Sequence, residues 1–165
     1  MEPEHSSFTC LPPAPKTVRG EPAFIDVSPK HLLYFNESLL VLRCLHDDSI
    51  LTLTHPADVV AAKFSPNFRY VASIDEKGNL FINEVLENKL YPSKNFEGVY
   101  RGAKAIDWTS DEKRICIVGN AKGNFGRIIS VDTGTDVGNI SAVMASLNSA
   151  SFRPERPFKL VTGGD

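Results

Sequence analysis

The side chains best suited to chemistry are too widely scattered in this sequence to form a recognisable catalytic or metal site. The chain has four histidines, and no two of them stand at the spacing of paired metal ligands. They are His5, His31, His46 and His55. No His-Glu-x-x-His, Gly-x-Ser-x-Gly or phosphate-binding glycine motif occurs. The sequence therefore gives no positive indication of hydrolytic or metal-dependent catalysis.

Two short segments match catalytic patterns only in part. The stretch Gly119-Asn120-Ala121-Lys122-Gly123 has the glycines of a phosphate loop but lacks its Gly-Lys-Ser/Thr ending, and it lies between two predicted strands. Asp107 and Asp111 flank Trp108, but nothing spaces them as an acid and a base with a leaving group between them. We interpret them as a strand end and a polar turn. The sequence predicts a protein that is not an enzyme and has no cofactor or metal.

A repeated aromatic turn signature indicates the elements that must carry any binding residues. Its three copies, 44 residues apart, are Phe64-Ser65-Pro66, Trp108-Thr109-Ser110-Asp111 and Phe152-Arg153-Pro154. A fainter copy, Val27-Ser28-Pro29, begins 37 residues before Phe64. A period of about 40–45 residues that holds several short strands is typical of a WD40-type β-propeller, in which each repeat forms a four-stranded blade. We therefore expect an all-β fold whose specificity lies on the blade rims.

The repeat predicts the boundaries of the units. We expect an extended N-terminal arm over residues 1–22, which are rich in proline and charge, and a partial propeller over 23–165. Its blades should cover about 23–54, 55–95, 99–140 and, incompletely, 144–165. The expected strands are Ala23–Val27, Leu32–Phe35, Leu39–Leu45, Ser49–Thr54, Asp58–Phe64, Tyr70–Ile74, Leu80–Val85, Lys89–Lys94, Ala103–Trp108, Arg114–Val118, Gly126–Val131, Asp136–Ile140, Ser146–Phe152 and Phe158–Thr162.

Two features of these units bear on function. An insertion, Gly119–Phe125, should lengthen the loop between the second and third strands of the third unit, and such insertions often carry binding. Closed propellers usually have four to eight blades, so about three and a half blades indicate the N-terminal piece of a longer protein. Such an open arc should leave blade faces and strand edges exposed. We expect the chain alone to be poorly stable or to self-associate.

Composition limits the classes of partner. The formal net charge is −2, which gives no electrostatic reason to expect nucleic-acid or membrane-surface binding. No apolar run approaches the ~20 residues of a membrane helix, and the first thirty residues lack a signal core. The three cysteines, Cys10, Cys44 and Cys116, form no metal or disulfide pattern, which suits a reducing cytosol.

Basic residues gather in the third unit. They are Lys104, Lys113, Arg114, Lys122 and Arg127. A solvated rim is the default interpretation of such a group. A binding surface for an acidic partner is the alternative.

The second unit retains part of the hydrogen-bonded tetrad of WD repeats, which joins a His, a Ser or Thr, an Asp and a Trp. Ser73 and Asp75 are candidate members. The Trp-Asp pair is replaced by Asn83-Glu84, and His55 stands about two residues early for its role. We therefore expect at best a partial tetrad and interpret His55 as an ordinary loop histidine.

With these motifs in place, the chain resembles the actin-interacting protein 1 family, the WD-repeat cofactors of ADF/cofilin. The resemblance runs in order over nearly the whole chain. The matching stretches are Phe8-Thr9-Cys10-Leu11-Pro12 with Arg19-Gly20, Val60–Pro66, Phe68–Ser73, Ile106–Asp111 with Lys113–Ile115, Val118-Gly119 leading to Asn124–Gly126, Asp132–Gly134 with Val137-Gly138, and Ser151–Pro154 with Arg156-Pro157 and Leu160–Gly163. The insertion before Phe125 and the Arg156-Pro157 pair are not general WD40 features, which makes the resemblance specific.

The resemblance implies a function in actin-filament turnover. Family members carry two seven-bladed propellers, and this chain would cover the start of the first. They bind actin filaments decorated with ADF/cofilin, promote filament disassembly in the cytoplasm and are not enzymes. One functional acidic position of the family lies in the third-blade insertion, where Asn120 and Gly123 replace the two acidic residues. Another matches Asp165. We expect partner contacts at Lys122, Asn124, Phe125, Arg127 and Asp165.

Two other functions stay open. A general WD40 scaffold for a complex unrelated to actin is favoured by the altered third-unit insertion. An enzymatic propeller would need converging carboxylates or a metal in the central channel, and the sequence offers neither.

Overall fold

The computed structural model describes residues 13–15, 24–87, 89–121, 123–141 and 146–165. In these residues the chain forms fourteen β strands and no helix. Blade 1 consists of β1 (Ile25–Val27), β2 (His31–Asn36), β3 (Leu39–Cys44) and β4 (Ile50–Thr54). Blade 2 consists of β5 (Val59–Phe64), β6 (Tyr70–Asp75), β7 (Leu80–Leu86) and β8 (Lys89–Phe96). Blade 3 consists of β9 (Ala103–Trp108), β10 (Arg114–Ala121), β11 (Asn124–Ser130) and β12 (Asp136–Ile140). Blade 4 consists of β13 (Leu147–Phe152) and β14 (Leu160–Gly164).

Each blade is an antiparallel meander in which successive strands are hydrogen-bonded neighbours. Short turns make this order possible. Gly78 in the turn between β6 and β7 has φ +87, and a Cβ on it would lie 2.7 Å from the backbone of Tyr100. The all-β prediction is confirmed, and the predicted strand ends agree with the structure within two residues except at the end of β10.

The insertion in the third unit is a hairpin extension rather than a longer loop, so that part of the prediction is wrong. β10 continues to Ala121 and β11 starts at Asn124, with these two residues paired across the hairpin. A register shift between Val118 and Ala121 absorbs the extra residues as a bulge. The extra length is therefore stiffened by pairing, which the polar composition of the segment did not indicate.

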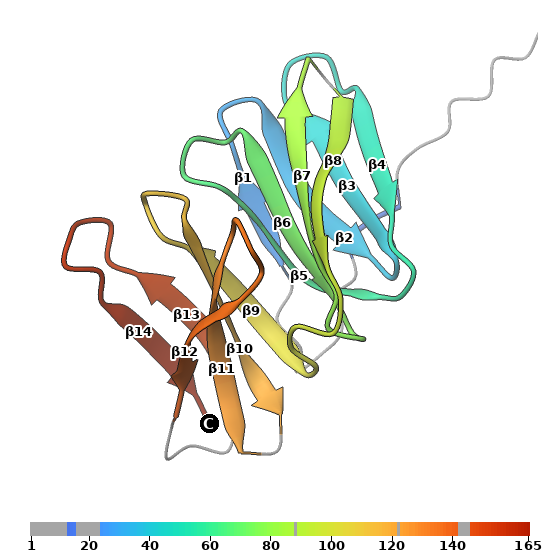
Figure 1. Ribbon diagram of the computed structural model, residues 1–165. Helices are drawn as coiled ribbons and strands as arrows, with labels where there is room; N and C mark the ends of the chain where they lie inside the picture. The colour runs from blue at the N-terminus through green and yellow to red at the C-terminus, as the bar shows by residue number, and fades with distance from the viewer. Residues whose placement is uncertain (1–12, 16–23, 88, 122, 142–145) are drawn as a thin grey trace, which may run out of the picture.

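The aromatic turn signature marks the strands that lie along one side of the arc. Phe64, Trp108 and Phe152 are the last residues of β5, β9 and β13, and Val27 ends β1. β9 lies against both β5 and β13, and β5 lies against β1. Figure 1 shows the four sheets standing side by side in an arc with these strands adjacent. The repeat period therefore corresponds to one blade.

The hydrophobic core lies between blades rather than within one sheet. Between blades 1 and 2, Leu33, Leu40 and Leu42 pack with Phe64 and Val71, all at most 4% exposed. The larger cluster, between blades 2 and 3, comprises Ala61, Ala72, Ile74, Leu80, Ile82, Val99, Tyr100, Ala103, Ile106, Trp108, Ile115, Ile117 and Ile129. Burial of apolar surface contributes about 25 cal/mol per Å², so blade stacking is the main source of stability.

The four sheets form an open arc (Figure 1). Large apolar side chains remain exposed along it, including Val161 on β14 at 71%, Val137 on β12 at 53% and Ile25 on β1 at 56%. Division of the chain at 23–54, 55–95, 99–140 and 144–165 remains our proposal for the blade boundaries. The arm expected over 1–22 lies outside the described residues apart from 13–15.

Candidate protein-binding rims

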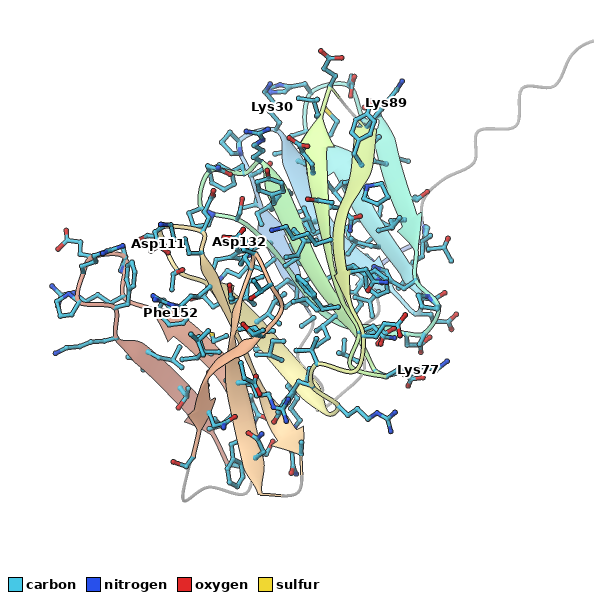
Figure 2. All side chains as sticks on the ribbon, in the orientation of Figure 1. Lys30, Lys77, Lys89, Asp111, Asp132 and Phe152 are labelled. Atoms are coloured by element: carbon cyan, nitrogen blue, oxygen red, sulfur yellow. The ribbon has the colours of Figure 1, made fainter. Side chains whose placement is uncertain are left out.

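The blade ends form two opposite rims. The proline rim carries the turns after β1, β5, β9 and β13, which include Pro29, Pro66 and Pro154. The hairpin rim carries the turns between the second and third strands of blades 1 to 3, together with the end of β14. Figure 2 shows Lys30 at the proline rim and Lys77 at the hairpin rim, at opposite ends of the blades.

Residues predicted as contacts in the third-blade insertion lie on the hairpin rim. Asn124 and Phe125 are half-buried at the start of β11. The Tyr100 hydroxyl donates a 2.6 Å hydrogen bond to the Asn124 carbonyl, which holds the hairpin against the blade 2–blade 3 connection. Burial raises the pKa of Tyr100, so the hydroxyl stays protonated and remains a donor. Lys122 lies outside the described residues.

Arg127 is held by contacts within the protein. Its Nη1 donates to the Val99 carbonyl at 3.1 Å and lies 3.2 Å from an Asp136 carboxylate oxygen. Its buried Nε has no partner among the described residues. The guanidinium therefore joins β11 to the start of blade 3 and to β12.

Asp165 lies on the same rim as the hairpin and is tied to blade 3. Asn148 Nδ2 donates to its carboxylate at 3.1 Å, and Lys104 Nζ donates to Asn148 Oδ1 at 2.9 Å. Figure 1 shows the C-terminus at the end of the blades where β10 and β11 meet. The structure thus brings Asn124, Phe125 and Asp165 to one rim, whereas Arg127 is used for internal packing.

The basic residues of the third unit do not form one patch, so the grouping expected from the sequence is wrong for the described residues. Lys113 and Arg114 lie at the proline rim, in and after the turn that follows β9. Lys104 lies near the hairpin rim and is bonded to Asn148, and Arg127 lies within β11. An antiparallel strand runs from one rim to the other, so residues at its two ends lie on opposite rims although they are close in sequence.

His55 is buried against blade 2 and is not an ordinary loop histidine, so that interpretation is also corrected. Only 4% of the residue is exposed, and its Nε2 lies 3.1 Å from the Ser73 hydroxyl. The ring packs edge-on against Phe81, which stands opposite Ser73 in the sheet. Burial lowers the pKa of His55 to about 4, although the charge of Asp75 acts in the other direction. The imidazole is therefore neutral at neutral pH.

The other two tetrad positions, Asp75 and Asn83, do not form the usual tetrad hydrogen bonds. Asp75 is fully buried and accepts 2.8 and 2.9 Å hydrogen bonds from the main-chain and side-chain nitrogens of Asn79. Asn83, at the position of the missing tryptophan, is buried, and its Nδ2 has no partner among the described residues. What remains of the tetrad is the His55–Ser73 pair, which includes the histidine that the sequence analysis had set aside and leaves out Asp75.

A set of side-chain to main-chain hydrogen bonds between blades, which we did not predict, joins the first strands of neighbouring blades. Asp26 accepts a 2.9 Å hydrogen bond from the Phe64 amide, and Asp107 accepts a 2.6 Å bond from the Phe152 amide. Asp107 also lies 2.8 Å from Lys63 Nζ. The candidate carboxylate of the sequence analysis is thus a structural brace.

A second set of braces joins successive turns of the proline rim. The Glu112 carboxylate accepts bonds of 2.9 and 2.7 Å from the main chain and side chain of Asn67. Arg156 donates to the Asp111 carboxylate at 3.1 Å. Both links span 45 residues, so the repeat period was the signal that could have revealed them.

The described residues offer little for catalysis or metal binding. No group of three or more His, Cys, Asp or Glu side chains among them could hold a metal ion. Burial, aided by Asp107, raises the pKa of the Cys116 thiol to about 12, so it stays protonated. None of the described segments forms a helix long and apolar enough to cross a membrane.

Antiparallel four-stranded blades at a 44-residue period, joined through interblade braces, define a WD40-type β-propeller in the form of an open arc. Comparison with known proteins shows which WD-repeat family the chain resembles in sequence. Actin-interacting protein 1 of Drosophila melanogaster is 36% identical over 155 residues, which are 92% of this chain and 26% of that protein. The Caenorhabditis elegans protein of the same name is 33% identical over 168 residues, 98% of this chain and 27% of that protein. WD repeat-containing protein 1 of Xenopus tropicalis is 33% identical over 155 residues, 92% of this chain and 26% of that protein. No family model matches the chain.

Over the matched residues, the chain belongs to the family of actin-interacting protein 1 and WD repeat-containing protein 1. It spans about a quarter of the length of the curated relatives that it matches.

Proposed function

We propose that this chain is part of an actin-filament-binding protein that acts with ADF/cofilin in the cytoplasm to promote filament disassembly. The observation that carries the proposal is the match over 92% of the chain to a protein whose name states that it interacts with actin. The parts of the proposal that concern cofilin and filament disassembly rest on the family resemblance of the sequence. The relatives are named for an interaction, so we also infer a function without catalysis.

The hairpin rim is the proposed contact surface. Tyr100 holds the β10–β11 hairpin in place, and the Lys104–Asn148–Asp165 chain of hydrogen bonds fixes a neighbouring carboxylate. Such a surface is already ordered before a partner arrives, so binding costs little conformational entropy. In this proposal Lys122, Asn124, Phe125 and Asp165 contact the partner, and Arg127 supports the hairpin from within.

Cosedimentation with actin filaments tests the proposal. We expect more of the chain to pellet with cofilin-decorated filaments than with bare ones. Lys122→Glu and Asp165→Asn should reduce that difference, because both change the charge of a proposed contact residue. Lys113→Glu on the proline rim makes the same charge change as Lys122→Glu, is the matched control and should behave like the unchanged chain. Equal pelleting with bare and decorated filaments would contradict the proposal.

A scaffold for a complex unrelated to actin is the second candidate. It is favoured by Asn120 and Gly123, which stand where the family pattern has acidic residues. A pull-down with the purified chain distinguishes the two functions. Recovery of defined partners without actin or cofilin would support the scaffold.

A further inference from the structure

A pocket opens on the proline rim at the junction between blades 1 and 2, away from the proposed actin surface. It has a volume of about 330 Å³. The lining residues that matter are Pro29, Lys30, His31, Phe68, Val85 and Glu87. The apolar members come from both blades, and the pocket therefore depends on how the two blades meet.

The turn brace found at the next two junctions is missing here. In the repeat, Phe68 corresponds to Glu112 and Arg156, each 44 residues after the last, and Lys30 corresponds to Asn67. Glu112 and Arg156 each bond back to the turn of the preceding blade. Phe68 has no polar group to do so. Among the described residues, no carboxylate forms an ion pair with Lys30.

Phe68 is an unusual choice for its position. Its φ is +61, a left-handed conformation that is costly for a bulky residue and is usually taken by Gly or Asn. The side chain is nevertheless 42% exposed, with its ring edge-on to Phe64. Glu112 shares this conformation at φ +58 but uses its side chain for the brace. Stability alone gives no reason for an exposed aromatic ring at this turn.

Lys30 supplies a cation to the pocket wall. It lines the pocket, and no carboxylate among the described residues forms an ion pair with it. Its ammonium makes that side of the pocket suitable for a carboxylate. His31 also lines the pocket, but its unpartnered Nε2 is buried, so we assign that atom no part in ligand binding. Glu87 on the lining disfavours a second acidic group.

We propose that this pocket docks a peptide segment of a partner protein in which a single acidic side chain stands next to a large apolar one. The carboxylate pairs with Lys30, in the place that Glu112 takes against Asn67 one blade further on. The apolar side chain packs on Phe68, Pro29 and Val85. This site is independent of the actin function proposed above and lies on the opposite rim.

Fluorescence anisotropy with labelled, capped tetrapeptides and the full chain tests this proposal. The probe contains glutamate followed by leucine, and its counterparts replace the glutamate by glutamine or the leucine by serine. We expect the glutamate–leucine peptide to bind about tenfold more tightly than either counterpart, the scale of one charge-assisted contact or one buried apolar side chain.

Two variants and a control identify the site. Lys30→Glu should remove the preference for glutamate over glutamine. Phe68→Asn should remove the preference for leucine over serine, and it should not unfold the chain because asparagine tolerates the left-handed conformation. Lys77→Glu makes the same charge change on the hairpin rim and should leave both preferences intact. The proposal is overturned if the three peptides bind equally, or if Lys77→Glu alters binding as much as Lys30→Glu does.

Discussion

At the scale of the residue, His55 is the most informative side chain. It is neutral, bonded to Ser73 and packed on Phe81. Its environment favours the uncharged imidazole, whereas the unfolded chain exposes it to water. Protonation must therefore weaken the packing of His55 on blade 2.

We predict that His55 makes stability fall as the pH is lowered. Its pKa is about 4 in the folded protein against an ordinary value of 6.5, so the unfolded state binds the proton more readily. The stability that this group contributes is present above about pH 6.5 and is lost as the pH falls towards 4. Between pH 7.5 and 5 the loss should be about 2 kcal/mol. Urea unfolding at both pH values measures it.

His55→Gln provides the control for the pH experiment. Glutamine can still bond to Ser73 but does not titrate, so the difference between the two chains isolates His55 from the carboxylates. Identical pH dependence in both chains would show that His55 is not the group responsible.

At the scale of the element, the end of β10 lies close against the backbone that leads into β9. A Cβ on Gly119 would lie 1.9 Å from the Gly102 carbonyl oxygen. We predict that Gly119→Ala costs about 3 kcal/mol or more, because backbone must move to relieve the clash. Gly123→Ala at the open tip, where φ is +91 but no atom lies within 4 Å, should cost only about 1 kcal/mol. Equal losses in urea unfolding would contradict this account of the hairpin.

The turn brace between blades 2 and 3 should show measurable coupling. A double-mutant cycle of Asn67→Ala and Glu112→Ala should give about 1 kcal/mol, since the side-chain bond carries a charged acceptor. The exposed pair Arg43–Asp48, within blade 1, is the comparison and should give close to zero. Urea unfolding at equal protein concentration supplies both values. If the coupling free energy of Arg43–Asp48 were larger than that of Asn67–Glu112, the result would contradict a stabilising contribution of the interblade brace above that of an exposed ion pair.

The elements were predictable from sequence because they follow local rules. Alternating apolar residues and turn signals predicted the strands, and the 44-residue period predicted the blades. The bonds between blades were not predictable in the same way. That Asp107 meets the Phe152 amide depends on how one sheet sits against the next.

The candidate site was predictable only in part, because some of its features have a local sequence signal and others depend on long-range contacts. The family resemblance indicated the third-blade insertion and Asp165, and the structure places them on one rim. The internal contacts of Arg127 are long-range and had no sequence signal. The pocket beside Phe68 depends on a left-handed turn that the residue type argues against.

At the scale of the whole molecule, the open arc leaves apolar side chains exposed on β12 and β14. We predict that the 165-residue chain self-associates in a concentration-dependent way, because Val161 on β14 and Val137 on β12 are more than half exposed. Sedimentation velocity over about a hundredfold range of concentration measures this, since association follows mass action. A monodisperse monomer with a sharp cooperative thermal transition would show the prediction to be wrong.

The spacing of the braces bears on how the polypeptide acquires its structure during synthesis. Each blade can form from hairpins that are close in sequence, but the Asn67–Glu112 and Asp111–Arg156 links join residues 45 positions apart. At a translation rate of about 5–20 residues per second, a finished blade waits roughly 2 to 9 seconds for its bracing partner to leave the ribosome. Its apolar face is open to chaperones during that interval. The speed of elongation across each blade boundary therefore sets how long a nascent blade is at risk of misfolding.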